Sequence, residues 1–236
     1  MEDATTKTIK WEKLEPWQYR FSARNDHPAA IPFRGLTIYA PGGLYHPWPL
    51  SSSHFIADRL PEIRGKTVLD LGCGTGVLGL WLADPKYGNC VTLTDIDPVS
   101  VAVAECNAMM NERFARILRT DLFGAFGPGR AWECVIFNAP LLCTAPPEDC
   151  PPQGTGAPQG TAHRMGTDPE GRTTKRFLAE LPSRLERNGV GYLPWSPQVG
   201  ADVLRLCQEH GLTAECVGRD WRESGIEVQL LEVRCG

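Results

Sequence analysis

The sequence predicts an α/β protein with a Rossmann-like, doubly wound, seven-stranded and mostly parallel sheet that has one antiparallel edge strand. Two observations lead to this fold class. Short apolar segments alternate with segments of helical length over most of the chain, which is typical of parallel strands covered by helices on both faces. The apolar segment 67–71 also runs directly into a turn with glycine at three alternate positions, and an apolar helix follows. The glycines are Gly72, Gly74 and Gly76.

The order of these segments gives the expected elements. Asp97 can cap a helix that begins at Pro98, because proline fits the first helical position. A helix from residue 172 is expected to break near Pro182. A final pair of strands joined by a polar turn supplies the antiparallel strand. A first short strand is expected at 36–39, ahead of the alternating pattern. The seven strands that follow are expected at 67–71, 89–95, 115–119, 134–138, 190–195, 212–217 and 227–233. The expected helices are 54–60, 77–83, 98–110, 172–187 and 196–210.

The helix 98–110 is expected to pack against the sheet through one apolar stripe. Apolar side chains recur there at helical spacing, and methionines are common packing residues. The stripe consists of Val99, Ala102, Val103, Cys106 and Met110.

Two regions lie outside this alternating pattern. Residues 1–50 are mixed and aromatic, with Trp11, Leu14 and Trp17 on one possible helical face, and we expect an N-terminal extension that serves as a substrate-side lid. Residues 51–236 are expected to form the main domain. Within it, residues 143–171 are rich in proline, glycine and threonine and predict a flexible loop that is a second candidate lid.

Composition narrows the classes of partner. The formal net charge is −4 and the isoelectric point is about 5.8, without the basic face typical of proteins that bind nucleic acids. We therefore expect a small-molecule substrate and consider a nucleic acid substrate unlikely. The nine cysteines are scattered without the spacing of metal ligands, which predicts reduced thiols and no metal site. The sequence shows neither a secretory signal nor a membrane-spanning segment, so we expect a cytoplasmic protein. The sequence leaves the oligomeric state open.

The glycine-rich turn suits a nucleoside ligand. Glycine tolerates positive φ and lets the backbone approach a ligand closely. Ligands of open α/β sheets bind at the carboxyl ends of the strands. With Asp70 two residues ahead of its first glycine, the turn resembles the first motif of class I S-adenosylmethionine-dependent methyltransferases. The resemblance implies their seven-stranded sheet and S-adenosylmethionine as the cofactor.

The same resemblance assigns roles to four consecutive strand ends. The first strand end and its turn would contact the methionine part of the cofactor. Asp95, with Ile96 beside it, would accept hydrogen bonds from both ribose hydroxyls, whereas capping explains Asp97. Asp121 would accept from the adenine amino group, and Leu122 would offer its main-chain N–H. The expected methionine-side residues are Asp70, Gly72, Cys73, Gly74 and Gly76, and Asn138 is expected to border the cofactor as well.

The fourth strand end carries the predicted chemistry. Residues 138–141, Asn-Ala-Pro-Leu, resemble the Asn-Pro-Pro-Tyr signature of enzymes that methylate nitrogen on planar groups. Oxygens from Asn138 and the carbonyl of Ala139 would accept the N–H protons and aim the nitrogen lone pair at the methyl group. Pro140 would make the segment rigid. Leu141 stands where the signature has an aromatic residue, so we expect a changed substrate platform.

The group most similar to residues 43–236 is that of the release-factor glutamine methyltransferases. Pro47, Pro49 and Ser51 match its proline-containing loop, and Tyr45, His46 and Trp48 would line the substrate side together with Leu141. Only about 40 residues precede the match, which favours N-methylation of a small molecule of secondary metabolism. Protein glutamine-amide methylation, O- or C-methylation of a small molecule, nucleic acid methylation and a silent cofactor-binding subunit stay open as alternatives.

Overall fold

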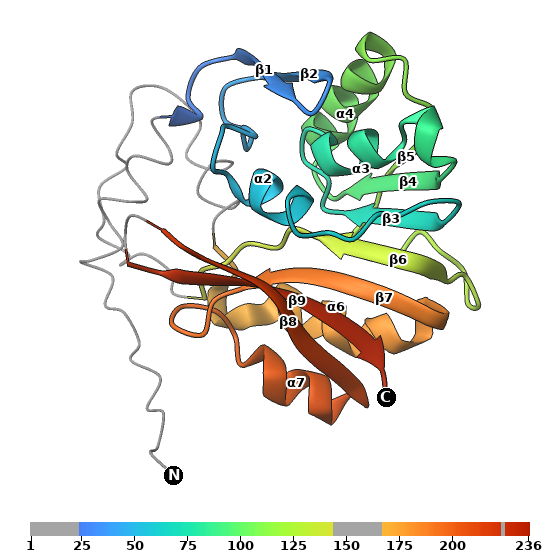
Figure 1. Ribbon diagram of the computed structural model, residues 1–236, viewed down its shortest axis with the longest axis vertical. Coiled ribbons are helices and arrows are strands. Elements are labelled where there is room, and N and C mark those ends of the chain that lie inside the picture. The colour runs from blue at the N-terminus through green and yellow to red at the C-terminus, as the bar shows by residue number, and fades with distance from the viewer. Residues whose placement is uncertain (1–23, 144–166, 223–224) are drawn as a thin grey trace.

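The computed structural model describes residues 24–143, 167–222 and 225–236. Their centre is a twisted seven-stranded sheet with the strand order β5-β4-β3-β6-β7-β9-β8 (Figure 1). Neighbouring strands are parallel from β5 to β7, and β9 is antiparallel to both β7 and β8. The predicted fold class is confirmed, with β9 lying one place inside edge strand β8. The strands of this sheet are β3 (Thr67–Leu71), β4 (Cys90–Asp95), β5 (Arg116–Arg119), β6 (Trp132–Phe137), β7 (Leu185–Trp195), β8 (Leu212–Trp221) and β9 (Glu227–Cys235).

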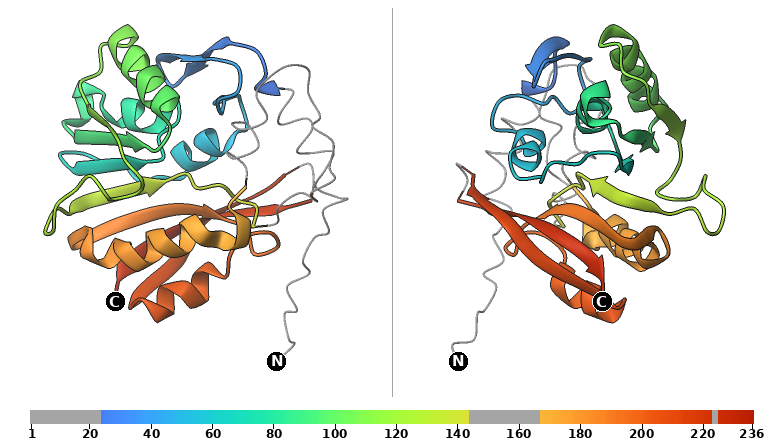
Figure 2. Two further views of the ribbon diagram at one scale, coloured as in Figure 1. Left: turned by 180° about the vertical axis from the view of Figure 1, so that it is seen from behind. Right: turned by 45° about the vertical axis from the view of Figure 1, so that its right-hand side comes forward.

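Helices cover both faces of the sheet (Figures 1 and 2). Alternate side chains of a strand point to opposite faces, and β3 follows this rule. Val68 packs into the core on the side of α2, α3 and α4, whereas Leu69 and Leu71 pack into the core beneath α6 and α7. The helices are α2 (Ser52–Ala57), α3 (Val77–Leu82), α4 (Pro98–Met110), α6 (Arg172–Glu180) and α7 (Val203–Glu209), with short 3-10 turns at Pro85–Tyr87, Pro169–Gly171 and Leu181–Ser183.

A separate two-stranded hairpin precedes the main sheet. Its strands β1 (Ala29–Phe33) and β2 (Leu36–Ala40) are antiparallel, and Ile31 pairs with Ile38. The sequence predicted β2 but not β1, because Pro32 interrupts the strand pattern and is tolerated only where its missing N–H is not needed. The buried side chains of Phe33 and Ile38 join the core shared with α2 and α3.

The stripe predicted to bury α4 is correct only at Val103, which is buried, and wrong at most of its other positions. Val99 is 53% exposed and Met110 is 61% exposed. The helix instead buries a face of small and polar residues, among them Ala104, Asn107 and Ala108. A Cβ atom added at Gly76 would lie 3.1 Å from the Cβ of Ala104. This close approach explains why small residues, rather than the methionines, face inward.

Some expectations fall on residues 1–23 and 144–166, which lie outside the described residues. They include the helical face of Trp11, Leu14 and Trp17 and most of the candidate lid at 143–171, of which the structure describes only residue 143 and residues 167–171. The division into an extension at 1–50 and a domain at 51–236 stays a prediction. In the described part of the chain, no helix has the length and apolarity needed to cross a bilayer.

Gly79 in α3 fixes how closely this helix approaches the sheet. A Cβ atom at this position would lie 2.7 Å from Cγ of Leu93 and 3.0 Å from Cβ of Asp70. We expect Gly79→Ala to lower the free energy of unfolding by about 1–3 kcal/mol through overpacking, which outweighs the roughly 1 kcal/mol that alanine gains over glycine inside a helix. Denaturant unfolding measures the change. Gly127→Ala is the control, because no atom lies within 4 Å of the added Cβ; equal stability of the two variants would contradict this packing.

Candidate cofactor and methyl-acceptor site

The structure brings the four predicted strand ends to one edge of the sheet. Leu71 at the end of β3 pairs with Thr94 of β4 on one side and with Phe137 of β6 on the other. Asp95 at the end of β4 pairs with Arg119 of β5. The segments that follow β3, β4, β5 and β6 therefore leave the sheet side by side. The switch in strand order, where such sheets bind ligands, lies between β3 and β6.

The glycine-rich turn is held open by its backbone conformation. Gly74 has φ of +55°, and a Cβ atom placed there would have no atom within 4 Å. Gly76 has φ of +81° and packs against Leu93 and Ala104. Gly76 is therefore required for packing, whereas Gly74 leaves the space that a closely approaching ligand needs. The ring of Phe137 lies 3.2 Å from the Cβ position of Gly72, which connects the turn to β6.

Asp95 ties the turn to the end of β4. Its Oδ2 accepts a hydrogen bond of 2.8 Å from the main-chain N–H of Gly74, and its Oδ1 accepts one of 2.9 Å from that of Asp97. Burial raises the pKa of Asp95, and these two N–H groups oppose the rise. Each carboxylate oxygen can accept more than one hydrogen bond, so Asp95 retains acceptor capacity for hydroxyl groups. Asp97 caps α4 through the N–H groups of Val99 and Ser100, as predicted.

Asp70 lies beneath the turn and is 2% exposed. Its Oδ2 accepts a hydrogen bond of 2.7 Å from the main-chain N–H of Gly79. Burial raises the pKa of Asp70 to about 7, and the nearby charge of Asp95 adds to the rise. Cys73 beside it is buried as well, and burial raises the pKa of its thiol. The Cys73 main-chain N–H is already donated to the Thr94 carbonyl at 2.8 Å.

The end of β5 presents Asp121 and Leu122. Leu122 is buried with φ of +46°. Asp121 is paired with Arg176 of α6, with N–O distances of 3.2 and 3.0 Å. The sequence did not predict this ion pair, since 55 residues separate its members. Ile96, which follows Asp95, is 60% exposed and is the exposed apolar side chain at this edge.

The end of β6 carries a free amide. Asn138 is half-buried, and its side chain makes no hydrogen bond within the described part of the chain. Ala139 is buried, and Pro140 and Leu141 are half-buried. Main-chain hydrogen bonds hold the next two residues. The Leu142 carbonyl accepts one of 2.7 Å from the Asp168 N–H, and the Cys143 N–H donates one of 2.8 Å to the Val199 carbonyl. The pairing of Phe137 with β3 fixes the backbone before Asn138, and these two bonds fix it after Leu141. A fixed backbone around an amide without a partner among the described residues suits the orientation of an incoming N–H group.

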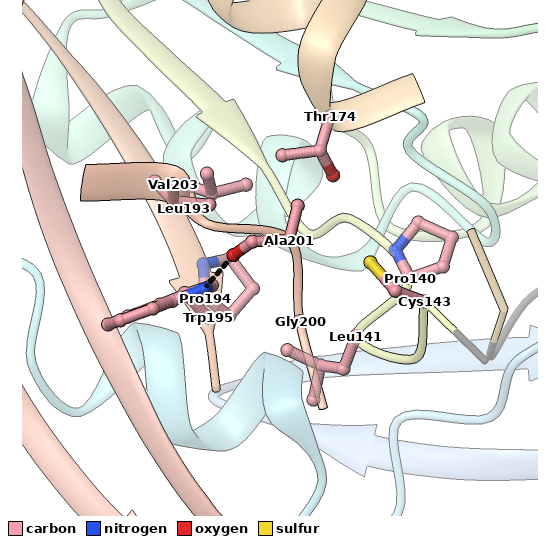
Figure 3. Close-up of a pocket in the computed structure, with 10 residues that line it drawn as sticks. All are labelled: Pro140, Leu141, Cys143, Thr174, Leu193, Pro194, Trp195, Gly200, Ala201 and Val203. Carbon is pink, nitrogen blue, oxygen red and sulfur yellow. Dashed lines mark hydrogen bonds between the residues drawn. The ribbon is translucent and has the colours of Figure 1, made fainter. Parts of the chain in front are cut away.

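A small pocket adjoins this segment. Pro140, Leu141 and Cys143 lie on one side, with Trp195 and Ala201 opposite (Figure 3). The indole N–H of Trp195 donates a hydrogen bond of 2.6 Å to the Ala201 carbonyl. The volume is about 10 Å³, which admits at most a water molecule. This pocket is therefore too small to accommodate a substrate group.

The predicted substrate-side residues have structural partners. Both ring nitrogens of buried His46 lie near main-chain carbonyls, at 2.7 Å from Leu44 and 2.9 Å from His27. A general base needs a free nitrogen at the substrate, so His46 is not placed for that role. The Tyr45 hydroxyl contacts Ser52 Oγ at 2.8 Å, and the Trp48 indole N–H donates to the Arg24 carbonyl.

The residues present fit the predicted cofactor. The hydroxyl oxygen of Thr75 is buried within the glycine-rich turn and has no hydrogen-bond partner among the described residues. Thr75 follows Gly74, where an added Cβ atom would meet no atom within 4 Å, and the carboxylate of Asp95 accepts from the Gly74 N–H. Unsatisfied buried polar groups mark sites that need an explanation. Thr75 was not among the residues predicted from the sequence, because the motif is defined by its glycines and its aspartate.

Comparison with known proteins connects this geometry to a family. Residues 49–145 match the family model of the methyltransferase small domain. A Methanocaldococcus jannaschii protein named "Putative protein N5-glutamine methyltransferase" is 31% identical over 147 residues, which cover 60% of this chain and 68% of that protein. The release factor glutamine methyltransferase of Rhodopirellula baltica is 22% identical over 198 residues, or 76% of this chain and 63% of that protein.

A solved structure shares the fold. It is the Thermus thermophilus 16S rRNA N2-guanosine methyltransferase RsmC in complex with AdoMet and guanosine. The TM-score is 0.62 and the identity 22%, over 89% of this chain and 50% of that chain.

These findings correct one expectation and support another. The expected small-molecule partner, with nucleic acid unlikely, is wrong: the relatives are named for protein or ribosomal RNA substrates, and small-molecule biosynthesis finds no support. The expected cofactor and enzyme class agree with the relatives. By this identity, coverage and fold, the chain belongs to the class I S-adenosylmethionine-dependent methyltransferases of the methyltransferase small domain type, enzymes whose cofactor is S-adenosylmethionine.

Proposed function

We propose that this protein is an N-methyltransferase that modifies the side-chain amide of glutamine in a protein. The observation that carries the proposal is Asn138, whose side-chain amide has no hydrogen-bond partner among the described residues. It follows the carboxyl end of β6, next to the switch in strand order, and the preceding residue, Phe137, packs against Gly72 of the glycine-rich turn. The names of the M. jannaschii and R. baltica relatives support this substrate class.

The cofactor would lie across the strand ends. Thr75 and the open backbone at Gly74 would contact its methionine part, and Asp95 would accept from the ribose hydroxyls. Asp121 and Leu122 would border the adenine, with Ile96 against the ring. Arg176 would hold the Asp121 carboxylate in position, because its guanidinium contacts both oxygens.

The chain's own part in the reaction is orientation. An amide nitrogen is a poor nucleophile, since its lone pair is delocalised into the carbonyl. Asn138 Oδ1 and the Ala139 carbonyl would accept its two N–H protons and turn the lone pair toward the reacting carbon. S-adenosylmethionine supplies a methyl group already activated by its sulfonium. The amide nitrogen would gain this methyl group and lose one proton to water, and the cofactor would leave as S-adenosylhomocysteine.

Methyl transfer to a defined acceptor tests the substrate class. We would incubate the protein with tritiated S-adenosylmethionine and a purified peptide-chain release factor, and locate the label by mass spectrometry. The control acceptor carries glutamate in place of the labelled glutamine. One methyl on a glutamine side chain, absent from the control, is the expected result. Label on ribosomal RNA offered in parallel, with none on the protein, would replace the proposal.

The raised pKa of Asp70 leads us to expect that cofactor affinity depends on pH. Its pKa of about 7 leaves the free site mostly protonated at pH 6 and mostly ionised at pH 8. A cationic cofactor favours the ionised carboxylate, so we expect the dissociation constant of S-adenosylmethionine to fall roughly tenfold between these pH values. Calorimetric titration measures the profile. Asp70→Asn is the control that should flatten it, and an unchanged slope in this variant would assign the titration to another group.

A further inference from the structure

Asn107 of α4 connects three parts of the molecule. Its side chain is 0% exposed. The Oδ1 atom accepts a hydrogen bond of 2.8 Å from the main-chain N–H of Tyr39, and Nδ2 donates one of 2.8 Å to the Tyr39 carbonyl. The same Nδ2 donates a third, of 2.9 Å, to the carbonyl of Thr75. Asn107 therefore links the β1-β2 hairpin to the glycine-rich turn.

The bond to Thr75 acts on the turn at a sensitive place. Two N–H groups of the turn are already bonded, since the Gly74 N–H donates to Asp95 and the Gly76 N–H donates to the Cys73 carbonyl at 2.8 Å. Asn107 binds the Thr75 carbonyl, which belongs to the same peptide group as the Gly76 N–H, so both polar atoms of this peptide group are held. The Thr75 hydroxyl, which has no hydrogen-bond partner among the described residues, belongs to the residue that Asn107 holds. Glycines on both sides give this residue little conformational restraint of its own.

We propose that Asn107 is a positioning residue for the cofactor and that, through it, the β1-β2 hairpin is part of the cofactor site. An asparagine side chain supplies one acceptor and two donors, which are the three groups that Tyr39 and Thr75 require. The hairpin lies outside residues 49–145, the segment that matches the family model. The inference rests on the proposed cofactor placement at the turn, and it does not depend on the acceptor.

The chain contains a matched control one helical turn further on. Asn111 binds Thr37 of the same strand in the same way, accepting from its N–H at 2.8 Å and donating to its carbonyl at 2.9 Å. Its Nδ2 also donates a hydrogen bond of 2.8 Å to the main-chain carbonyl of Asn107, which any substitution at position 107 retains. No hydrogen bond links the Asn111 side chain to the glycine-rich turn among the described residues. Removing either amide loosens the hairpin, but only the Asn107 amide reaches Thr75.

The test compares Asn107→Ala with Asn111→Ala. We would measure the dissociation constant of S-adenosylmethionine by calorimetry, the free energy of unfolding without cofactor, and KM and kcat for the cofactor. The expected result is a loss of stability in both variants, with at least a tenfold weaker affinity in Asn107→Ala alone. KM should rise with the dissociation constant, while kcat at saturating cofactor stays within threefold. Equal affinity changes in the two variants, or none in Asn107→Ala, would overturn the proposal.

A second variant at position 107 keeps the test decisive. If Asn107→Ala does not fold, Asn107→Asp replaces it, with Asn111→Asp as its control. In both, the carboxylate keeps the acceptor for the N–H of β2 and loses the donor to its carbonyl, but only Asn107→Asp also loses the donor to Thr75. Its expected affinity loss is again at least tenfold, and wild-type affinity would contradict the role. The dissociation constant, which decides the proposal, is measured without any acceptor; only KM and kcat require one. A failure of the glutamine proposal therefore leaves this result unaffected, whereas a failure here leaves methyl transfer to glutamine untouched.

Discussion

Asn138→Ala is expected to lower kcat by about 10²–10³-fold while the dissociation constant of S-adenosylmethionine changes less than threefold. Removal of one preorganised polar group that acts on the reacting atoms costs a factor of this order. The asparagine amide makes no hydrogen bond within the described part of the protein, so its loss leaves no buried partner unsatisfied. Steady-state methylation of the acceptor identified above measures kcat.

Asn138→Asp is the matched variant for this prediction. A carboxylate keeps oxygen acceptors for the N–H protons and changes the charge, so we expect it to retain more activity than alanine. If Asn138→Ala keeps kcat within threefold of the wild type, orientation by this amide is not how the enzyme works. A parallel loss of cofactor affinity would instead assign Asn138 to cofactor binding.

Asp95→Ala is expected to weaken S-adenosylmethionine binding by about 1.5–3 kcal/mol, the range for hydrogen bonds to a charged group. This corresponds to roughly 10- to 150-fold in the dissociation constant. The reason is twofold: the ribose hydroxyls lose their acceptor, and the main-chain N–H of Gly74 loses the partner at 2.8 Å that shapes the turn. Calorimetric titration with the cofactor measures the change.

Asp97→Ala separates this role from simple stabilisation of α4. Asp97 caps the helix through Val99 and Ser100, so its loss should cost about 1 kcal/mol of stability and leave cofactor affinity within twofold. If Asp95→Ala and Asp97→Ala weaken cofactor binding equally, Asp95 is not the residue that binds the ribose.

The sequence predicted the centre of the molecule well because several local signals agreed there. β3 was predicted with its observed bounds, since the apolar strand is followed directly by three alternating glycines, a pattern typical of a turn. Asp97 and Pro98 likewise fixed the start of α4. β7 was expected to begin at residue 190 but begins at Leu185. It passes through Asn188, which has φ of +65°, and its pairing with β6 shifts register between Trp132 and Cys134. Because the pairing is irregular, the first part of β7 can be polar. From the sequence this polar part was predicted to be the end of the preceding helix.

The missed residues of the site share one property: their roles depend on partners distant in sequence. Asn107 is polar and lies between small residues, so a hydrophobic pattern assigned the buried face of α4 to Val99 and Met110. Only the approach of β2 and the glycine-rich turn explains its burial. Arg176 likewise depends on an element 55 residues away.

The central claim is that the ends of β3, β4, β5 and β6 hold the cofactor with its sulfur toward Asn138. A crystal structure with S-adenosylhomocysteine and a glutamine-containing acceptor peptide tests it most directly. We predict ribose hydroxyls on Asp95, the methionine part along Gly74 and Thr75, and the glutamine amide between Asn138 and the sulfur. Ribose bound away from Asp95, or a glutamine amide that does not contact Asn138, would contradict it.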